Sequence, residues 1–217
     1  MRHKSKPAWL KVRIGSGKRF KSVRNTLHSQ GLHTVCEEAM CPNIAECWNG
    51  GTATFMVLGK VCTRHCNFCS VQSAKQGEDL DRNEPRKIAS AVKQFNLQYA
   101  VLTSVDRDDL EDGGARHFAE CIRAVKESGA KVEALIPDFQ GNTECLYKIV
   151  DAKPDVISHN IEVVERLQAI ARDPRASYQQ SLQVISDVKK LDEKIFTKSS
   201  IMLGLGESYN EVLHAMD

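Results

Sequence analysis

The chain has 217 residues, a formal net charge of +2, 41% hydrophobic residues and 27% charged residues. This length suffices for one well-buried core. A charge so close to zero excludes a protein that binds polyanions through its overall charge, so we expect no nucleic-acid partner. No stretch approaches the roughly 18 apolar residues that a membrane span requires, so no membrane partner is expected either.

Eight cysteines are unusual for a chain without an apolar signal segment at its start. Six of them lie between Cys36 and Cys69, which favours metal ligands over residues that merely fill a core. Disulfide frameworks belong to secreted proteins, so these cysteines predict a reducing compartment and thiols kept for metal.

Residues 1–35 carry nine Lys and Arg and neither Asp nor Glu. This composition fits a mitochondrial targeting segment, and it fits equally a basic arm that lies over the domain. We favour the basic arm. The corresponding localisation is cytoplasmic for a bacterial protein and mitochondrial for a eukaryotic one.

Short apolar runs alternate with helical patterns from residue 53 onward. The predicted strands cover residues 54–58, 99–105, 131–136, 155–158 and 195–203. The predicted helices carry apolar residues at helical spacing: Ile88, Val92 and Phe95 after Pro85; Phe118, Ile122 and Val125; Leu146, Ile149 and Val150; Leu182, Ile185 and Val188. Strands that alternate with helices pair in parallel through right-handed crossovers.

We therefore predict an α/β fold, a partial (β/α) barrel preceded by an N-terminal extension that bears cysteines. The extension covers residues 1–52 and the barrel residues 53–217. The last pattern, Tyr209–Met216, begins a helix directly before the chain stops. We expect from this that a C-terminal part of the barrel is missing.

Cys62, Cys66 and Cys69 form the strongest motif, a Cys-x3-Cys-x2-Cys loop after the first predicted strand. Three thiolates on a cubic iron–sulfur cluster leave one iron open to a small molecule. The alternative is a zinc site with His65 or a distant residue as fourth ligand, although structural zinc sites usually combine two pairs of ligands. The spacing, with Phe68 before the last cysteine, resembles the signature of radical S-adenosylmethionine (SAM) enzymes, in which SAM chelates the open iron.

The other cysteines divide into a second triplet and two single residues. Cys36, Cys41 and Cys47 have Cys-x4-Cys-x5-Cys spacing and suit a second cluster, a second zinc site or plain reduced thiols. Cys121 and Cys145 lie in helical patterns, and we expect them to be buried and inert.

Polar residues follow several predicted strands, where the chemistry of (β/α) barrels is found. Thr103 and Ser104 end the second strand, and Asn160 and Glu162 follow the fourth. They suit either a cofactor or the capping of the next helix. We expect the lone His159 to be structural rather than a catalytic base.

Several stretches together resemble the lipoyl synthase family of radical SAM enzymes. Besides the two cysteine triplets, the similar stretches are residues 6–10, 53–56, 102–110, 112–115, 135–139, 158–162, Tyr178, 181–182 and 197–207. The Cys36, Cys41 and Cys47 set is the most discriminating, because related enzymes such as biotin synthase lack it.

The resemblance implies two [4Fe-4S] clusters and SAM as cofactors. The cluster on Cys62, Cys66 and Cys69 would reduce SAM to a radical that removes hydrogens from an octanoyl chain on a carrier protein. The cluster on Cys36, Cys41 and Cys47 would supply the two sulfur atoms of the lipoyl product. Implied partners are lipoyl-carrier domains, namely the acyltransferase subunits of 2-oxoacid dehydrogenases and the H protein of glycine cleavage, with ferredoxin or flavodoxin as reductant. SAM binding carries over to Thr103, Ser104, Asn160, Glu162 and Arg175, and no side chain is assigned as a catalytic acid or base.

The chain also departs from the family pattern. The family completes its second cluster with a serine from a C-terminal Arg-Ser-Ser-Tyr motif, which this sequence lacks. We therefore interpret the chain as a truncated lipoyl synthase. The alternatives are another sulfur-inserting radical SAM enzyme, or a non-catalytic metal-binding module if truncation abolishes activity.

Overall fold

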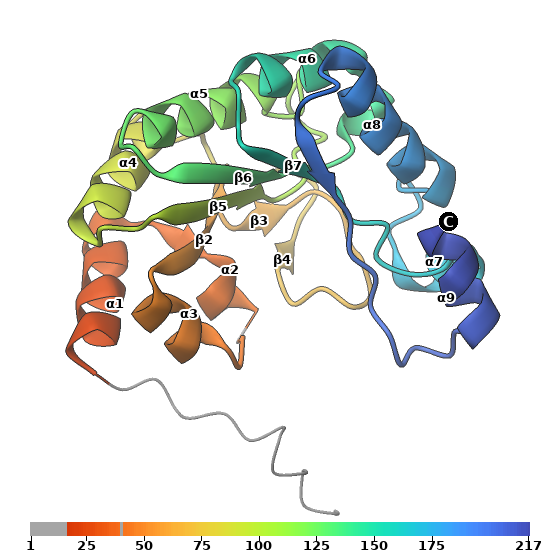
Figure 1. Cartoon of the computed structure of the whole chain (residues 1–217), viewed down its shortest axis with the longest axis horizontal. Coiled ribbons are helices and arrows are strands. Elements are labelled where there is room, and N and C mark those ends of the chain that lie inside the picture. The colour runs from red at the N-terminus through yellow and green to blue at the C-terminus, as the bar shows by residue number, and fades with distance from the viewer. Residues whose placement is uncertain (1–16, 40) are drawn as a thin grey trace, which may run out of the picture.

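The chain folds around a six-stranded sheet with the strand order β1-β2-β5-β6-β7-β8 (Figure 1). The computed structural model describes residues 17–39 and 41–217, so part of the expected basic arm, residues 1–16, lies outside the described residues. Strands β2, β5, β6, β7 and β8 are parallel, and β1 pairs antiparallel with β2. A separate small sheet pairs β3 with β4.

The strands are β1 (His33–Thr34), β2 (Thr52–Val57), β3 (Val61–Cys62), β4 (Gln72–Ser73), β5 (Tyr99–Ser104), β6 (Lys131–Leu135), β7 (Val156–Ser158) and β8 (Phe196–Lys198). The helices are α1 (Lys18–Gln30), α2 (Val35–Glu38), α3 (Ile44–Gly50), α4 (Glu84–Gln94), α5 (Ala115–Lys126), α6 (Thr143–Asp151), α7 (Gln168–Ala171), α8 (Tyr178–Leu191) and α9 (Tyr209–Met216), with short 3-10 turns η2 (Phe139–Gly141) and η3 (Glu165–Leu167). The five predicted strands and the predicted helices after residue 53 are confirmed, although β8 is much shorter than the predicted 195–203.

Helices α4, α5, α6 and α8 cover one face of the sheet in chain order and leave the opposite face concave (Figure 1). The register aligns Met56 with Thr103, Thr103 with Leu135 and Leu135 with Ser158. The carboxyl ends of neighbouring parallel strands therefore meet at one edge. The predicted partial (β/α) barrel is confirmed. The edge formed by the carboxyl ends of the strands is the one at which (β/α) barrels carry their active sites.

Helix α4 illustrates why these segments are helical. Pro85 occupies the first turn, where its missing N–H is no loss, and Ile88, Ala91 and Val92 form the buried face. In α8 the prediction of the buried face was partly wrong. Leu182 is 39% exposed, and Ser181 takes the inward position. Ser181 can be buried because its hydroxyl group is hydrogen-bonded to the side chains of Arg172 and His159.

The N-terminal helices pack onto the same core as the sheet. Val23, Leu27 and Trp48 are almost fully buried in one apolar cluster with the strand residues, and the Phe20 and Trp48 rings lie 5.1 Å apart. Helix α1 was not predicted, because few of its side chains are apolar. The division at residues 52 and 53 stays a prediction.

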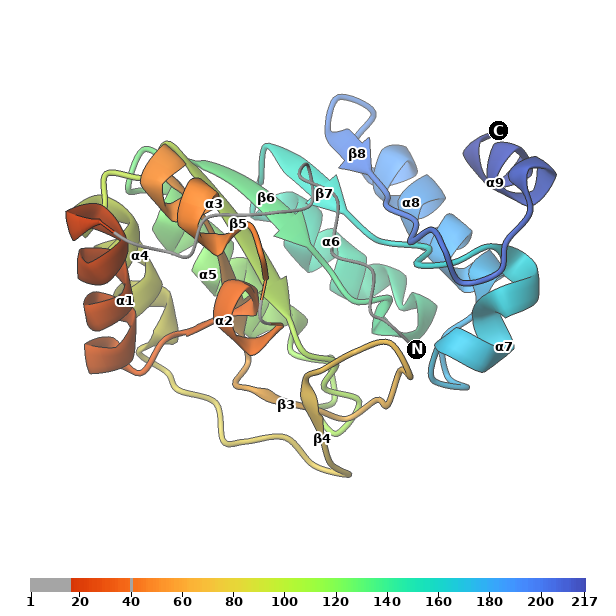
Figure 2. The same cartoon turned by 90° about the horizontal axis from the view of Figure 1, so that it is seen from below.

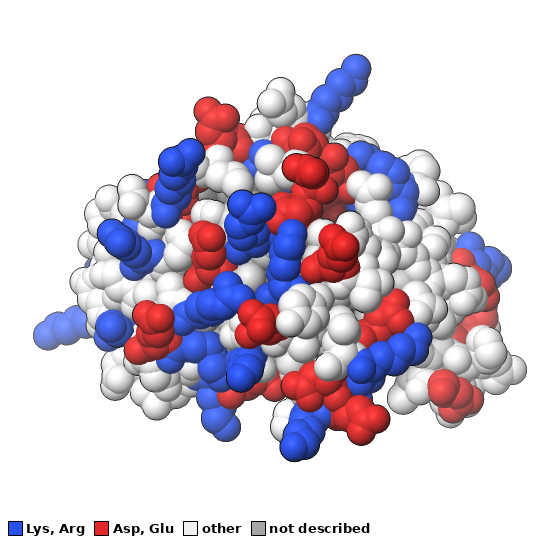
Figure 3. Space-filling model, turned by 90° about the horizontal axis from the view of Figure 1, so that it is seen from above, with Lys and Arg blue, Asp and Glu red and all other residues white. Residues whose placement is uncertain are grey.

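The outer face carries Lys, Arg, Asp and Glu side chains intermixed rather than in patches of one sign (Figure 3). This pattern gives that face no strong field of either sign. Among the helices of the described residues, none combines the length and the apolar character that crossing a membrane requires.

Candidate metal and cofactor site

A cavity of about 280 Å³ lies at the edge where the parallel strands end. Cys62, Cys66 and Cys69 all contribute to its wall. The loop that carries them runs from β3 to β4, beyond the ends of β2 and β5 (Figure 2). The structure thus brings the predicted cysteine motif and the predicted strand ends together.

Backbone amides point at two of the three sulfurs. The amides of Arg64 and Asp106 each donate to Cys62 Sγ at 3.4 Å, and the amide of Asp173 donates to Cys66 Sγ at 3.4 Å. Such N–H to sulfur bonds are a recognised influence on the potential of iron–sulfur clusters. None of the eight cysteines forms a disulfide within the described part of the chain.

The surroundings of two thiols of this loop, Cys62 and Cys66, disfavour the negatively charged thiolate form. Burial raises the pKa of Cys62 to about 11, and the neighbouring Asp106 carboxylate contributes. Burial also raises the pKa of Cys66. A bound metal reverses this balance, because it deprotonates the thiols that coordinate it. Three soft ligands on the wall of one cavity, two of them with amide donors, therefore fit an iron–sulfur cluster.

Arg64, between the first two cysteines, anchors the loop to the strand ends. Its guanidinium donates to both Asp138 oxygens at 2.7 Å and to Asp108 at 2.8 and 2.9 Å. Burial is the largest influence on both carboxylates and opposes their ionisation, but the hydrogen bonds and charge of Arg64 outweigh it and lower the pKa of each. Burial raises the pKa of Asp106 to about 6.

The segment after α7 holds the other side of the loop. Asp173 Oδ2 accepts from the His65 amide at 2.9 Å, and Ala171 O accepts from the Asn67 amide at 2.9 Å. Because the Asp173 amide also binds Cys66 Sγ, this segment fixes both the backbone and one sulfur of the loop.

Arg175, predicted to bind SAM, belongs to this anchoring segment. Its guanidinium donates to Thr63 O at 2.7 Å and to Asp173 Oδ1 at 2.8 Å, and it pairs with Asp108 at 3.1 Å. It is absent from the residues that line the cavity in the described chain. Its predicted role in SAM binding stays a prediction.

The other four residues predicted to bind SAM line the cavity: Thr103, Ser104, Asn160 and Glu162. The hydroxyl oxygen of Ser104 is buried and finds no hydrogen-bond partner among the described residues. Burial raises the pKa of Glu162, which also has a left-handed φ of 66°. Buried polar atoms without partners are rare, so this wall suits a polar ligand.

Sequence reasoning missed Arg172, which lines the cavity with its buried Nε unpaired in the described structure. Its Nη1 donates to Ser181 Oγ at 2.8 Å, and Ser181 lies 3.0 Å from His159 Nε2. His159 Nδ1 donates to Ile136 O at 2.9 Å, so both ring nitrogens are engaged. His159 also lines the cavity, so the structural role expected for it stays a prediction. No sequence signal distinguishes Arg172 from the nearby Arg175.

The second triplet lies on the N-terminal helices. Cys36 is in α2, Cys47 is in α3 and Cys41 lies between them. Burial raises the pKa of Cys47, and the thiols of Cys36 and Cys41 raise it further, as expected of three neighbouring sulfurs. Val35, next to Cys36, lines the cavity of the first triplet. The remaining cysteines, Cys121 and Cys145, are 0% and 3% exposed, as predicted.

Comparisons with known proteins agree with this geometry. The profile of the radical SAM superfamily matches residues 56–217, and that of the N-terminal domain of lipoyl synthase matches residues 1–41. A lipoyl synthase of Methanocella arvoryzae is 54% identical over 97% of this chain and 72% of its own length, and one of Halorhodospira halophila is 52% identical over 98% and 64%. The crystal structure of methylornithine synthase shares the fold, with a TM-score of 0.58 and 13% identity over 93% of this chain and 60% of that one.

The chain therefore belongs to the radical SAM superfamily, whose members use SAM and a [4Fe-4S] cluster. Within that superfamily, it belongs to the lipoyl synthase family. It covers between 64% and 75% of the length of the curated relatives compared.

Proposed function

We propose that this chain carries out lipoyl synthase chemistry, the insertion of two sulfur atoms into an octanoyl chain bound to a carrier protein. One observation carries the proposal: the first cysteine triplet and a residue that adjoins the second triplet line the same cavity. Cys62, Cys66 and Cys69 line it directly, and Val35 brings the segment of Cys36 to its wall.

A cluster on Cys62, Cys66 and Cys69, with SAM bound to it, supplies the one-electron chemistry that breaks an unactivated C–H bond. The chain's own residues hold and orient these groups. The amides of Arg64, Asp106 and Asp173 fix two of the sulfurs. The side chains of Val35, Met56 and Ile136 give the cavity wall an apolar part.

The polar wall of the cavity suits the charged ends of SAM. Arg172 offers to a carboxylate a buried Nε that has no partner among the described residues, and Glu162 offers a half-buried carboxyl group to an amine. Ser104 offers a hydroxyl group that is left without a partner in the part of the chain that the structure describes. We assign Thr103, Ser104, Asn160 and Glu162 to SAM, and we place Arg172 ahead of Arg175 in that role.

Cys36, Cys41 and Cys47 would hold a second cluster that donates sulfur. The partners would be octanoylated lipoyl-carrier domains and a small reductant such as ferredoxin or flavodoxin. The compartment would be the cytoplasm in a bacterium and the mitochondrion in a eukaryote.

The test is anaerobic reconstitution followed by counts of iron and sulfide, SAM cleavage and the mass of an octanoyl-lysine peptide. Replacing Cys62, Cys66 and Cys69 by alanine should abolish SAM cleavage. Replacing Cys36, Cys41 and Cys47 by alanine should leave SAM cleavage and abolish sulfur insertion. Colourless protein that holds zinc, or sulfur insertion that survives loss of the second triplet, would contradict the proposal.

A further inference from the structure

The turn between β2 and β3, directly before the cluster loop, has an unusual backbone. Leu58 and Gly59 have φ angles of 70° and 88° in succession. The left-handed region disfavours leucine, and such residues persist only where their surroundings over-determine them. The Leu58 side chain is 1% exposed, and it packs so tightly on Gly114 that a Cβ there would lie 2.6 Å from Leu58 Cδ1.

Two buried charged side chains hold both polar atoms of the Leu58 backbone. Its amide donates to Glu84 Oε2 at 3.0 Å, and its carbonyl accepts from Arg107 Nη1 at 3.1 Å. Glu84 is 7% exposed at the start of α4, and Arg107 is 4% exposed in the loop after β5. Three separate elements thus meet at this one residue.

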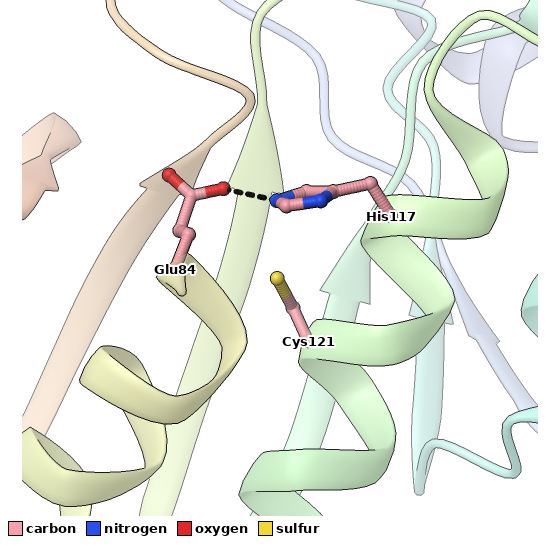
Figure 4. A group of neighbouring side chains, drawn as sticks. All are labelled: Glu84, His117 and Cys121. Carbon is pink, nitrogen blue, oxygen red and sulfur yellow. Dashed lines mark hydrogen bonds and ion pairs between the residues drawn. The ribbon is translucent and has the colours of Figure 1, made fainter. Parts of the chain in front are cut away.

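Each of the two side chains is held in turn by a partner. His117 Nε2 of α5 lies 2.6 Å from Glu84 Oε2, and the two side chains point at each other (Figure 4). Arg107 donates from Nε and Nη2 to the two oxygens of Asp109 at 2.9 and 3.0 Å. The backbone of Gly77 lies against Arg107, since a Cβ there would overlap with the Arg107 Nε.

The turn is linked to Cys62 by two routes. Along the chain, Cys62 follows Leu58 by way of the short strand β3. Through space, Arg107 binds the Leu58 carbonyl, and its neighbour Asp106 donates its amide to Cys62 Sγ at 3.4 Å. A shift of Arg107 therefore moves an amide that points at a ligand sulfur.

We propose that the Glu84–His117 and Arg107–Asp109 pairs are positioning groups that fix this turn and thereby place the Cys62 sulfur. The inference rests on the cluster at Cys62, Cys66 and Cys69, not on sulfur insertion. A metal ion is the competing explanation, because ligand atoms of Glu84, His117 and Cys121 lie within 4.8 Å of one another. Glu84 Oε2 and His117 Nε2 are already hydrogen-bonded to each other, and Glu84 Oε2 also accepts from the Leu58 amide. These bonds favour a hydrogen-bonded pair over a metal site.

The test compares Glu84→Ala with Glu84→Gln, which keeps an acceptor oxygen, and with Cys121→Ala. In metal-free protein, hydrogen exchange of the Leu58 amide should accelerate on the order of tenfold or more in Glu84→Ala, since a hydrogen bond to a charged group contributes about that factor. Exchange should accelerate less in Glu84→Gln, whose neutral amide oxygen still accepts a hydrogen bond, and it should be unchanged in Cys121→Ala. After reconstitution, only Glu84→Ala should show an altered electron paramagnetic resonance spectrum and faster loss of iron.

Circular dichroism establishes that each variant is folded. If Glu84→Ala does not fold, Arg107→Lys replaces it, because lysine cannot bind Leu58 and Asp109 together as a guanidinium does. Normal Leu58 exchange and a normal cluster spectrum in the folded variant overturn the proposal. So does stoichiometric zinc binding to cluster-free protein that Cys121→Ala abolishes. None of these measurements depends on sulfur insertion. They therefore still test this proposal if the chain proves unable to insert sulfur.

Discussion

Replacing Arg64 by methionine is the most direct test of how the cluster loop is held. The side chain is 3% exposed, and it neutralises Asp108 and Asp138, whose side chains are 13% and 0% exposed. Removing one partner from a buried ion pair typically costs about 3–5 kcal/mol, because the other charge stays buried without compensation. A domain of ordinary stability has only about 5–15 kcal/mol in total.

The assay is urea unfolding of the reduced, cluster-free protein. With a slope of about 2–3 kcal/mol per molar urea, the midpoint should fall by roughly 1–2.5 M. Arg64→Lys, which keeps the charge but loses the forked geometry, should lose less. A loss below about 1 kcal/mol at neutral pH would refute the reasoning, since it would mean that water or other groups already satisfy the two carboxylates.

The same variant has a defined pH dependence. Arg64 lowers the pKa of Asp108 and Asp138 from the ordinary 3.8, so their stabilising contribution is present above that value and lost as the pH falls through the folded value. Without Arg64, burial raises these pKa values instead. The deficit of the variant should therefore be largest near pH 7 and shrink as the pH falls toward 3.8, and a deficit independent of pH would point to lost packing.

Two further substitutions test other parts of the site. Arg172→Gln should weaken SAM binding by about tenfold or more in anaerobic calorimetry, since a hydrogen bond to a charged group is worth about 1.5–3 kcal/mol. Arg175→Gln should weaken it less, and the reverse order would restore Arg175 as the SAM ligand. Gly114→Ala should destabilise the fold by about 1–3 kcal/mol beyond Gly129→Ala in thermal unfolding. Both glycines have left-handed φ angles, of 83° and 89°, but only a Cβ at Gly114 would meet the Leu58 side chain; equal losses would show that this contact relaxes freely.

The parallel half of the fold follows from the sequence because its strands are short segments rich in apolar residues with clear helical patterns between them. Residues 131–135, for example, lie between the helical patterns of Phe118 and Leu146. This alternation of strands and helices along the chain predicts a parallel sheet. The small strands β3 and β4 have two residues each, too few for any periodicity to appear.

The cysteine triplets were recognisable because their spacing is local, whereas the rest of the site depends on contacts between distant residues. Arg172 and Arg175 are separated by two residues, yet one lines the cavity and the other binds the carbonyl of Thr63. Only the direction of the chain after α7 distinguishes them. The inward position of Ser181 also depends on distant residues, because the Ser181 hydroxyl contacts Arg172 and His159.

The long-range anchoring of the cysteine loop has a consequence for how the holoprotein matures. The loop is tied to Asp138, 74 residues away in sequence, and to Asp173, 108 residues from His65. Closing such separated contacts is slow and requires most of the sheet to be in place. We therefore expect the three thiols to come together late in folding, so that an iron–sulfur delivery system meets an already folded acceptor rather than a nascent chain.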